Sequence, residues 1–174
     1  PCLLLQDESL IKTRAFRQGL YIGDPVNTVR IFNELEVDEL LLLDVTASSR
    51  KKSPNFRTIS NVASQCFMPL GYGGGINSLE HARQIFELGV EKIVINTSAL
   101  ENPIFIAELV KYFGSQAIVV SIDVKKNLFG NYVVKSVGGR RTTRWSALDW
   151  ALEVEKYGAG EILLTSIDRE GSWQ

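Results

Sequence analysis

The chain has few of the residues that mark metal sites, disulfide frameworks and membrane spans. Two cysteines and one histidine among 174 residues allow at most one disulfide and no recognisable metal cluster. The longest apolar runs, such as Leu40 to Leu43, fall far short of the roughly 20 residues that a membrane-spanning helix needs. The net charge is −1 and basic residues are spread along the chain, which argues against nucleic-acid binding. We therefore expect no metal, no cofactor, no nucleic acid and no membrane.

The remaining composition is that of a folded domain. Hydrophobic residues make up 45% of the chain and charged residues 22%, which excludes a disordered chain and makes one domain the default. Cys2 and Cys66 lie in apolar, strand-like sequence, so we expect small buried side chains in a reducing, cytoplasmic compartment. The chain opens on an apolar strand without a methionine, so we expect further residues before Pro1.

Six short apolar runs alternate with amphipathic stretches, the pattern of parallel strands joined by crossover helices. Each run is nearly continuous in Leu, Ile and Val, as strands covered on both faces are. The buried strands are expected at residues 2–5, 39–44, 67–71, 92–95, 118–123 and 161–165.

Capping residues mark the helices between these strands. Asp24-Pro25 and Asn102-Pro103 each place a capping side chain before a proline at the first helical position. Asn77 and Glu80 resemble a capping box of a helix that starts near Ser78. One apolar helix face is expected at Val26, Val29, Phe32 and Leu35, and helix-closing glycines at Gly89, Gly114 and Gly158.

An internal repeat decides between two α/β architectures. The helix-to-strand joints at 34–44, 87–96 and 156–166 share one plan, which favours a TIM (β/α)₈ barrel. An open doubly wound sheet would need a glycine fingerprint after the first strand, and residues 6–9 offer none. We expect six of the eight βα units in a single barrel domain over residues 1–174, truncated at the C-terminus. The unpaired edges of strands one and six then predict self-association.

Candidate site residues are the polar groups that end the strands, where a barrel places its active site. Gly74 and Gly75, in the triplet GYGGGINS before a helix, expose backbone N–H groups that suit a phosphate. The alternative is a tight turn that needs positive φ. Asn96 and Thr97 could add side-chain donors to the phosphate site. Further strand-end candidates are Asp44 and Thr46, Asp123, and residues Thr165 to Gly171.

Asp123 is the candidate acid/base, because a carboxylate at the rim of an apolar barrel is placed for a tuned pKa. The alternative is a solvated loop residue or cap. Lys12, in the expected loop after strand one, could neutralise substrate charge or simply be solvated. His81 falls on a helix outside the barrel, which argues against a Ser-His-Asp or metal-histidine mechanism.

Two further features lie away from these residues. Glu39, Lys92 and Glu161 each open an even-numbered strand, so they could form a polar ring at the barrel floor or simply face solvent. The segment after Asp123 alternates about Phe129-Gly130-Asn131, which predicts a β-hairpin over the C-terminal face, a candidate lid.

Taken together, these residues resemble the cyclase subunit of imidazole glycerol phosphate synthase, an enzyme of histidine biosynthesis. The resembling motifs are PCLLL, DPVNTVRIFN, ELLLLDVTASS, GGGINSLEHARQIF, VEKIVINTSAL, FGSQAIVVSIDVKK and GAGEILLTSIDREG. The resemblance implies a cytoplasmic (β/α)₈ lyase. In that family, ammonia from a glutaminase partner at the barrel floor reacts with a phosphorylated ribulosyl aminoimidazole nucleotide.

The resemblance also assigns roles to residues of this chain. It places the catalytic strand-five aspartate on Asp123 and a substrate-contacting loop lysine on Lys12. It places the first phosphate site on Gly75, Asn96 and Thr97, the second phosphate region on Thr165, Glu170 and Gly171, and the ammonia gate on Glu39, Lys92 and Glu161.

Three positions depart from the family pattern. Leu4 stands where the family has a second essential aspartate, Gly71 where it usually has threonine, and Glu170 where it has aspartate. Leucine cannot transfer a proton, so Leu4 opens two alternatives. One is a sister branch encoded with bacterial surface-polysaccharide genes, which passes ammonia toward an acetamidino sugar. The other is a non-catalytic barrel that activates a glutaminase.

Overall fold

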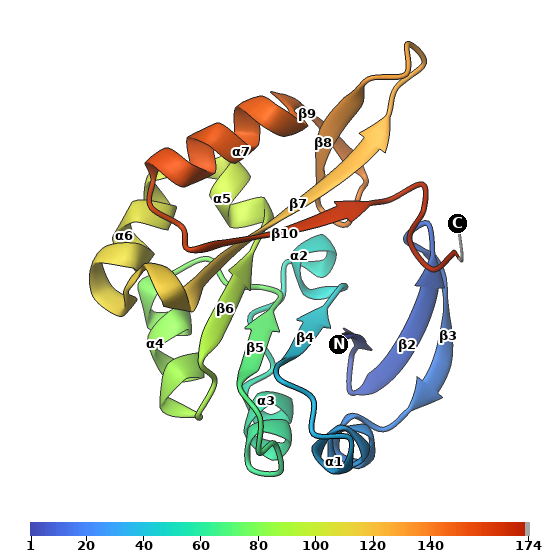
Figure 1. The fold of residues 1–174 in the computed structure, drawn as a ribbon, viewed down its shortest axis with the longest axis vertical. Helices are drawn as coiled ribbons and strands as arrows, with labels where there is room; N and C mark the ends of the chain where they lie inside the picture. Colours follow the sequence, from blue (N-terminus) through green and yellow to red (C-terminus); the bar gives the residue numbers. More distant parts are fainter. Residues whose placement is uncertain (173–174) are drawn as a thin grey trace. The chain divides into compact units, whose positions relative to one another are not determined.

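The computed structural model describes residues 1–172 as two compact units (Figure 1). The N-terminal unit contains Pro1–Lys12 and Gly19–Val94, and the C-terminal unit contains Thr13–Gln18 and the residues from Ile95 onward. Strands and helices alternate in both of them, as the α/β class requires.

The N-terminal unit is a sheet with helices between its parallel strands. Its strands are β1 (Cys2–Gln6), β2 (Ser9–Arg14), β3 (Arg17–Gly23), β4 (Leu40–Asp44), β5 (Leu70–Gly73) and β6 (Lys92–Ile95), in the order β3-β2-β1-β4-β5-β6. Its helices are α1 (Pro25–Glu34), α2 (Ala47–Arg50), α3 (Phe56–Ala63) and α4 (Leu79–Glu87). The pairs β1–β4, β4–β5 and β5–β6 are parallel, whereas β1–β2 is antiparallel.

The strand register sorts the side chains of this sheet onto two faces. Leu4 pairs with Leu43, and Leu43 pairs with Gly73, so these residues share one face. On the other face, Leu5 and Leu42 are fully buried under the helices. Burial of this kind on the helix-covered face supplies most of the apolar stabilisation of a parallel sheet.

The C-terminal unit is built around one long strand. Its elements are α5 (Thr97–Glu101), α6 (Ile104–Phe113), η1 (Ser115–Ala117), β7 (Ile118–Lys126), β8 (Tyr132–Ser136), β9 (Arg141–Ser146), α7 (Ala147–Lys156) and β10 (Glu161–Ser166). Strand β7 is parallel to β10 and antiparallel to β8, and β8 is antiparallel to β9. Residues 118–124 of β7 are all buried, because β8 and β10 flank it and α6 and α7 contact it.

All six expected strands are present, and the hairpin about Phe129 is confirmed. The third strand, however, begins at Leu70 rather than Phe67, which is 87% exposed; Pro69 has no N–H to offer a sheet. The expectation that every strand is buried is wrong for β10, where Leu164 is exposed. Among residues 1–172, β10 pairs only with β7.

The helix starts were predicted with mixed success. Asp24 caps α1 as expected, accepting a hydrogen bond from the N–H of Asn27 at 2.9 Å. The cap of α4 is Ser78 rather than Asn77, because the Ser78 hydroxyl accepts from the N–H of His81. Asn102 instead ends α5, and α6 begins at Ile104 without a side-chain cap. The glycines expected to close helices have positive φ: Gly89, Gly114 and Gly158.

Two expectations about buried side chains are wrong. On the expected face of α1, Val29 is buried but Leu35 is exposed, because Leu35 follows the last residue of the helix. Cys2 is exposed at the first residue of β1, and Cys66 is half-buried between α3 and β5; both thiols are free. Among residues 1–172, no helix is both long and apolar enough to cross a membrane.

Candidate active site

The best-formed candidate group is Asp123, near the C-terminal end of β7. Its side chain is 9% exposed and accepts a hydrogen bond from the amide of Asn96, with Nδ2 3.0 Å from Oδ2. The hydroxyl of Ser121 lies 3.4 Å from Oδ1. Burial outweighs these two donors and raises the pKa of Asp123 to about 6. The carboxyl group can therefore exchange a proton close to neutral pH.

Asn96 holds this carboxylate in place from the end of β6. Its Nδ2 donates both to Asp123 and to the backbone carbonyl of Ser121, at 3.0 Å in each case. The Oδ1 atom of Asn96 is buried and has no hydrogen-bond partner among the described residues. This unpaired acceptor is free to receive a hydrogen bond from a bound molecule.

Thr165, Thr97 and Lys135 are further polar residues of the C-terminal unit, and Lys135 on β8 pairs directly with Asp123. Thr165 on β10 is the direct neighbour of Asp123 in the parallel pair. Thr97 begins α5, and its hydroxyl oxygen accepts from the backbone N–H of Val137 at 3.1 Å. The structure thus brings together Asp123, Asn96 and Thr165 as strand-end residues, while phosphate binding by Asn96 and Thr97 stays a prediction.

The glycine triplet lies in the N-terminal unit and forms a tight turn. Gly74 and Gly75 have φ of +123° and +74°, a region that side chains disfavour. An added Cβ would collide with the carbonyl of Asp44 at Gly74 and with the carbonyl of Lys52 at Gly75. These glycines are therefore required by the turn itself, and their binding of phosphate stays a prediction.

Asp44, expected to contact substrate, makes local hydrogen bonds. Its Oδ1 accepts from the N–H and the hydroxyl of Thr46, both at 2.9 Å, and from the N–H of Ala47 at 3.0 Å. The carboxylate thereby supports the start of α2. Its second oxygen, Oδ2, is the one that remains for a ligand.

The segment around Lys12 differs from the expected loop. Lys12 lies inside β2, which pairs with β1 and continues through a turn into β3. No turn-favouring residue indicates this hairpin, because its turn residues Ala15 and Phe16 are neither Gly nor Asn although both have positive φ. The prediction of a loop lysine is therefore wrong in its structural part, and a substrate contact by Lys12 stays a prediction.

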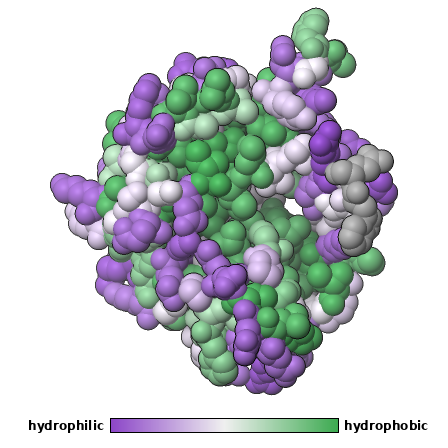
Figure 2. All heavy atoms as spheres, in the orientation of Figure 1, coloured by the Kyte–Doolittle hydropathy of each residue, from purple (hydrophilic) through white to green (hydrophobic). Residues whose placement is uncertain are grey.

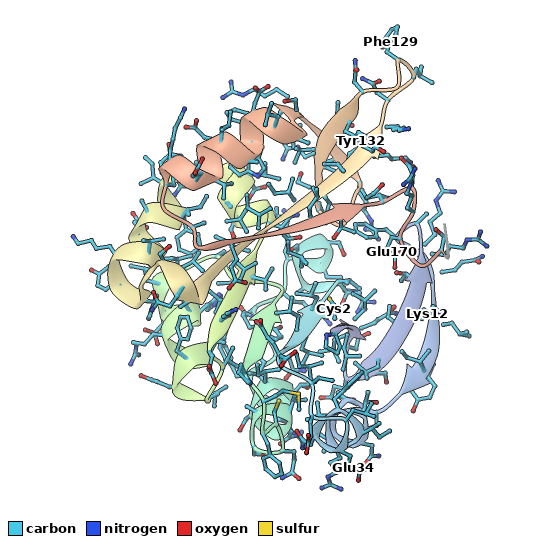
Figure 3. The ribbon with its side chains drawn as sticks, viewed as in Figure 1. Cys2, Lys12, Glu34, Phe129, Tyr132 and Glu170 are labelled. Atoms are coloured by element: carbon cyan, nitrogen blue, oxygen red, sulfur yellow. The ribbon has the colours of Figure 1, made fainter. Side chains whose placement is uncertain are left out.

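Glu170, on the loop after β10, is tied to this turn within the C-terminal unit (Figure 3). Its carboxylate accepts from the hydroxyl of Thr13 at 2.7 Å and from the N–H of Phe16 at 3.0 Å. Its backbone carbonyl accepts from the N–H of Ala15 at 3.0 Å. Gly171 has φ of +67°, and the carbonyl of Thr13 occupies the place of any Cβ there. Both oxygens of Glu170 are thus engaged, and a phosphate contact by Glu170 and Gly171 stays a prediction.

Two of the three expected gate residues form an ion pair in the N-terminal unit. The ammonium of Lys92 lies 3.1 Å from the carboxylate of Glu39, and both side chains are partly buried. Glu161 is exposed at the first residue of β10, in the C-terminal unit. The pairing of Glu39 with Lys92 agrees with the expected polar ring, whereas the role of a gate stays a prediction.

Leu4 has apolar neighbours in every strand that pairs with β1. Its direct partners are Leu43 on β4 and Ile11 on β2. Gly71, the other departure on these strands, leaves space that the side chain of Leu41 fills. Neither direct strand partner of Leu4 therefore has a side chain that could donate a hydrogen bond to a carboxylate at position 4, as Asn96 does to Asp123.

The sequence analysis missed residues that hydrogen-bond to the predicted site residues. Ser121 lies two residues before Asp123 on the same face of β7, a spacing that could have identified it. Thr13 and Phe16, which bind Glu170, carried no sequence signal. His81 lies on α4 as expected, with its ring edge-on to Phe56 at 6.0 Å between centroids.

Comparison with known protein families matches residues 1–174 to the family described as "Histidine biosynthesis protein". The chain belongs to this family. Its members are TIM barrels, so the six βα units of this chain belong to the (β/α)₈ barrel class. The polar strand-end residues described above occupy the edge where such barrels carry their sites.

Members of the histidine biosynthesis family with similar sequences carry related names. A Pseudomonas aeruginosa protein, provisionally named imidazole glycerol phosphate synthase subunit hisF2, is 53% identical over 98% of this chain and 68% of its own length. A Leptospira borgpetersenii protein with the provisional name subunit HisF is 49% identical over 99% of this chain and 68% of its own length. The HisF subunit of imidazole glycerol phosphate synthase from Chlorobium luteolum is 41% identical over 99% of this chain and 68% of its own length.

Proposed function

We propose that the chain is a cyclase-type subunit of imidazole glycerol phosphate synthase, in which Asp123 transfers protons on a phosphorylated substrate. The observation that carries the proposal is the buried carboxylate of Asp123, whose pKa of about 6 suits both proton acceptance and donation near neutral pH. The names of the relatives give the same activity.

In this proposal the neighbouring residues bind and orient the substrate. Asn96 donates to Oδ2 of Asp123, and the reacting atom approaches Oδ1, where the hydroxyl of Ser121 lies 3.4 Å away. In the N-terminal unit, Gly74 and Gly75 contact phosphate. In the C-terminal unit, Asn96 and Thr97 contact phosphate, and the loop containing Thr165, Glu170 and Gly171 contacts a second phosphate. Lys12 neutralises substrate charge, and Asp44 contacts the substrate through its free oxygen.

The proposed source of nitrogen is a glutaminase subunit at the barrel floor. Ammonia would enter past Glu39, Lys92 and Glu161, of which the first two form an ion pair. A charged pair at such an entrance can part and re-form without a covalent step. Activity with glutamine should therefore require the partner subunit, whereas activity with ammonium salts should not.

The test is ammonia-dependent turnover of the ribulosyl aminoimidazole nucleotide by the full-length protein. Asp123→Asn should lower turnover by about a hundredfold or more, since it removes the proton-transferring group but keeps its shape. Asp149→Asn, at an exposed carboxylate on α7 outside the proposed site, is the matched control and should keep full turnover. Equal turnover by Asp123→Asn and the unmodified protein would refute the proposal.

A second candidate function rests on Leu4 and its apolar neighbours. Without an aspartate there, the subunit would deliver ammonia to a different phosphorylated acceptor, such as a precursor of an acetamidino sugar of surface polysaccharide. Leu4→Asp should raise turnover of the imidazole-pathway nucleotide if the chain is a weakened cyclase. It should leave that turnover unchanged if the acceptor is a sugar.

A non-catalytic barrel that only activates a glutaminase is distinguished by ligand binding. A catalytic subunit should be stabilised by phosphorylated ligands. Its melting temperature should therefore rise when inorganic phosphate or ribose 5-phosphate is added. Substituting Asn96 by alanine should reduce that rise. No shift with either ligand, together with full stimulation of the glutaminase, would favour the non-catalytic role.

A further inference from the structure

The β7–β8 hairpin and strand β9 carry most of the concentrated positive charge of the chain. Residues 124–146, here called the basic hairpin, contain no Asp or Glu, although the whole chain has a net charge of −1. Its basic residues are Lys125, Lys126, Lys135, Arg140, Arg141 and Arg144. One-sided charge on a projecting element attracts an anionic partner.

The tip of the basic hairpin is apolar and fully exposed. Leu128 is 102% exposed and Phe129 is 88% exposed. Figure 3 shows Phe129 at the far end of the β7–β8 hairpin, and Figure 2 shows hydrophobic side chains gathered there. Asn127 braces this tip, because its Oδ1 accepts from the N–H groups of Phe129 at 2.9 Å and Asn131 at 3.0 Å. The tip is therefore a formed turn whose two apolar side chains are held out in solvent.

Cationic and aromatic side chains pair below this tip. The ammonium of Lys126 lies 5.3 Å from the ring centroid of Tyr132, and the guanidinium carbon of Arg144 lies 5.1 Å from that of Trp145. A depression of about 500 Å³ opens here, lined by Arg144, Trp145 and Asn131 together with the start of α7. Apolar side chains therefore lie at the tip of the basic hairpin, and aromatic rings paired with basic groups lie below them.

We propose that the basic hairpin docks on an anionic lipid bilayer. Leu128 and Phe129 enter the boundary between headgroups and acyl chains, while Lys126 and Arg144 contact lipid phosphates. The layered order favours a bilayer over a nucleic acid, because the exposed ring of Phe129 at the tip is separate from the cations. Lys126 and Arg144 each lie over one face of an aromatic ring below the tip. Such docking needs no spanning helix.

The test is co-sedimentation of the full-length protein with vesicles of phosphatidylcholine alone or with a quarter phosphatidylglycerol. Binding should appear only with the anionic vesicles and weaken as salt is added. Phe129→Ser and Arg144→Glu should each weaken it by about tenfold or more. The matched controls lie outside the hairpin: Phe67→Ser, at a phenylalanine that is 87% exposed, and Arg57→Glu should bind normally.

Two results would overturn the proposal. One is equal sedimentation with both vesicle types or with neither. The other is loss of binding in the control variants to the same degree as in the hairpin variants, which would indicate non-specific adsorption to the vesicles. Binding of single-stranded RNA that depends on Phe129 and Arg144, without vesicle binding, would assign the hairpin to nucleic acid instead. Circular dichroism of each variant checks that the fold is kept.

Discussion

Asp123, on β7 of the C-terminal unit, and Leu4, on β1 of the N-terminal unit, have opposite surroundings. Asp123 receives a hydrogen bond from Asn96 and has a hydroxyl, from Ser121, within reach. Leu4 is flanked by Leu43 and Ile11 and has no such donor beside it. The surroundings of position 123 therefore stabilise a carboxylate by hydrogen bonds, whereas the surroundings of position 4 are apolar and disfavour one. The difference shows that strand positions of one barrel class differ in the hydrogen-bond donors that they offer a carboxylate.

The largest effect should come from removing the charge of Asp123. Its pKa rises from 3.8 to about 6 on folding, so ionisation costs the folded state about 3 kcal/mol. Because the pKa of Asp123 is raised in the folded state, the free energy of unfolding is highest below pH 4, where the carboxyl group is protonated in both states. About 3 kcal/mol of it is lost as pH rises through 6. Asp123→Asn should therefore gain about 3 kcal/mol relative to the unmodified protein between pH 4 and pH 7, measured by urea unfolding. An unchanged difference across this range would contradict the buried, unfavourable charge.

The next largest effect should come from placing a carboxylate at Leu4. Leu4→Asp introduces a charge among Leu43 and Ile11 without donors, and we expect the free energy of unfolding at pH 7 to fall by about 2 kcal/mol. The loss should shrink at pH 4, where the new carboxyl group is protonated more easily. Leu4→Asn is the matched control, with the same shape and no titration. Urea unfolding at both pH values measures the effect.

A smaller effect should follow from Asn96→Ala. Loss of the amide donor removes stabilisation from the ionised form, so the pKa of Asp123 should rise by about one unit further. The lower limb of the pH profile of turnover should then move to higher pH by the same amount, whereas a purely structural defect would lower turnover equally at every pH. Thr97→Ala, at the next residue, is the control and should leave the limb where it is.

The smallest effect concerns the turn that Glu170 holds. Glu170→Gln weakens the hydrogen bonds to Thr13 and Phe16, so trypsin should cleave after Arg14 or Arg17 several times faster, with about 1 kcal/mol lost from local opening. Adding Ala15→Asn and Phe16→Gly, residues that suit two successive positive φ values, should restore protection. Equal cleavage rates in all three proteins would show that Glu170 does not hold the turn.

The two hairpins explain how much of the fold was predictable. The β7–β8 turn contains Asn127, Gly130 and Asn131, residues with an intrinsic turn preference, and it was predicted. The β2–β3 turn is formed by Ala15 and Phe16, which gain their conformation from contacts with Glu170 far along the chain. Local preference identifies elements that form locally and misses those fixed by distant partners.

The same division applies to the candidate site. The positions of Asp123, Asn96 and Thr165 at strand ends follow from apolar periodicity, which the sequence displays directly. The hydrogen bonds of Asp44 to Thr46 and of Glu170 to Thr13 depend on side-chain geometry, which periodicity does not encode. Residue types therefore indicated where the site lies, and only the structure showed which groups are already engaged.

The contact between Glu170 and the β2–β3 turn also orders the events of folding. During synthesis, Thr13 to Phe16 leave the ribosome long before Glu170 exists, so their strained turn has no partner for most of translation. The turn is completed only when the loop after β10 arrives, with Gly171 fitting against the carbonyl of Thr13. The turn is thus secured only after residue 170 has been synthesised, although its own residues are made much earlier.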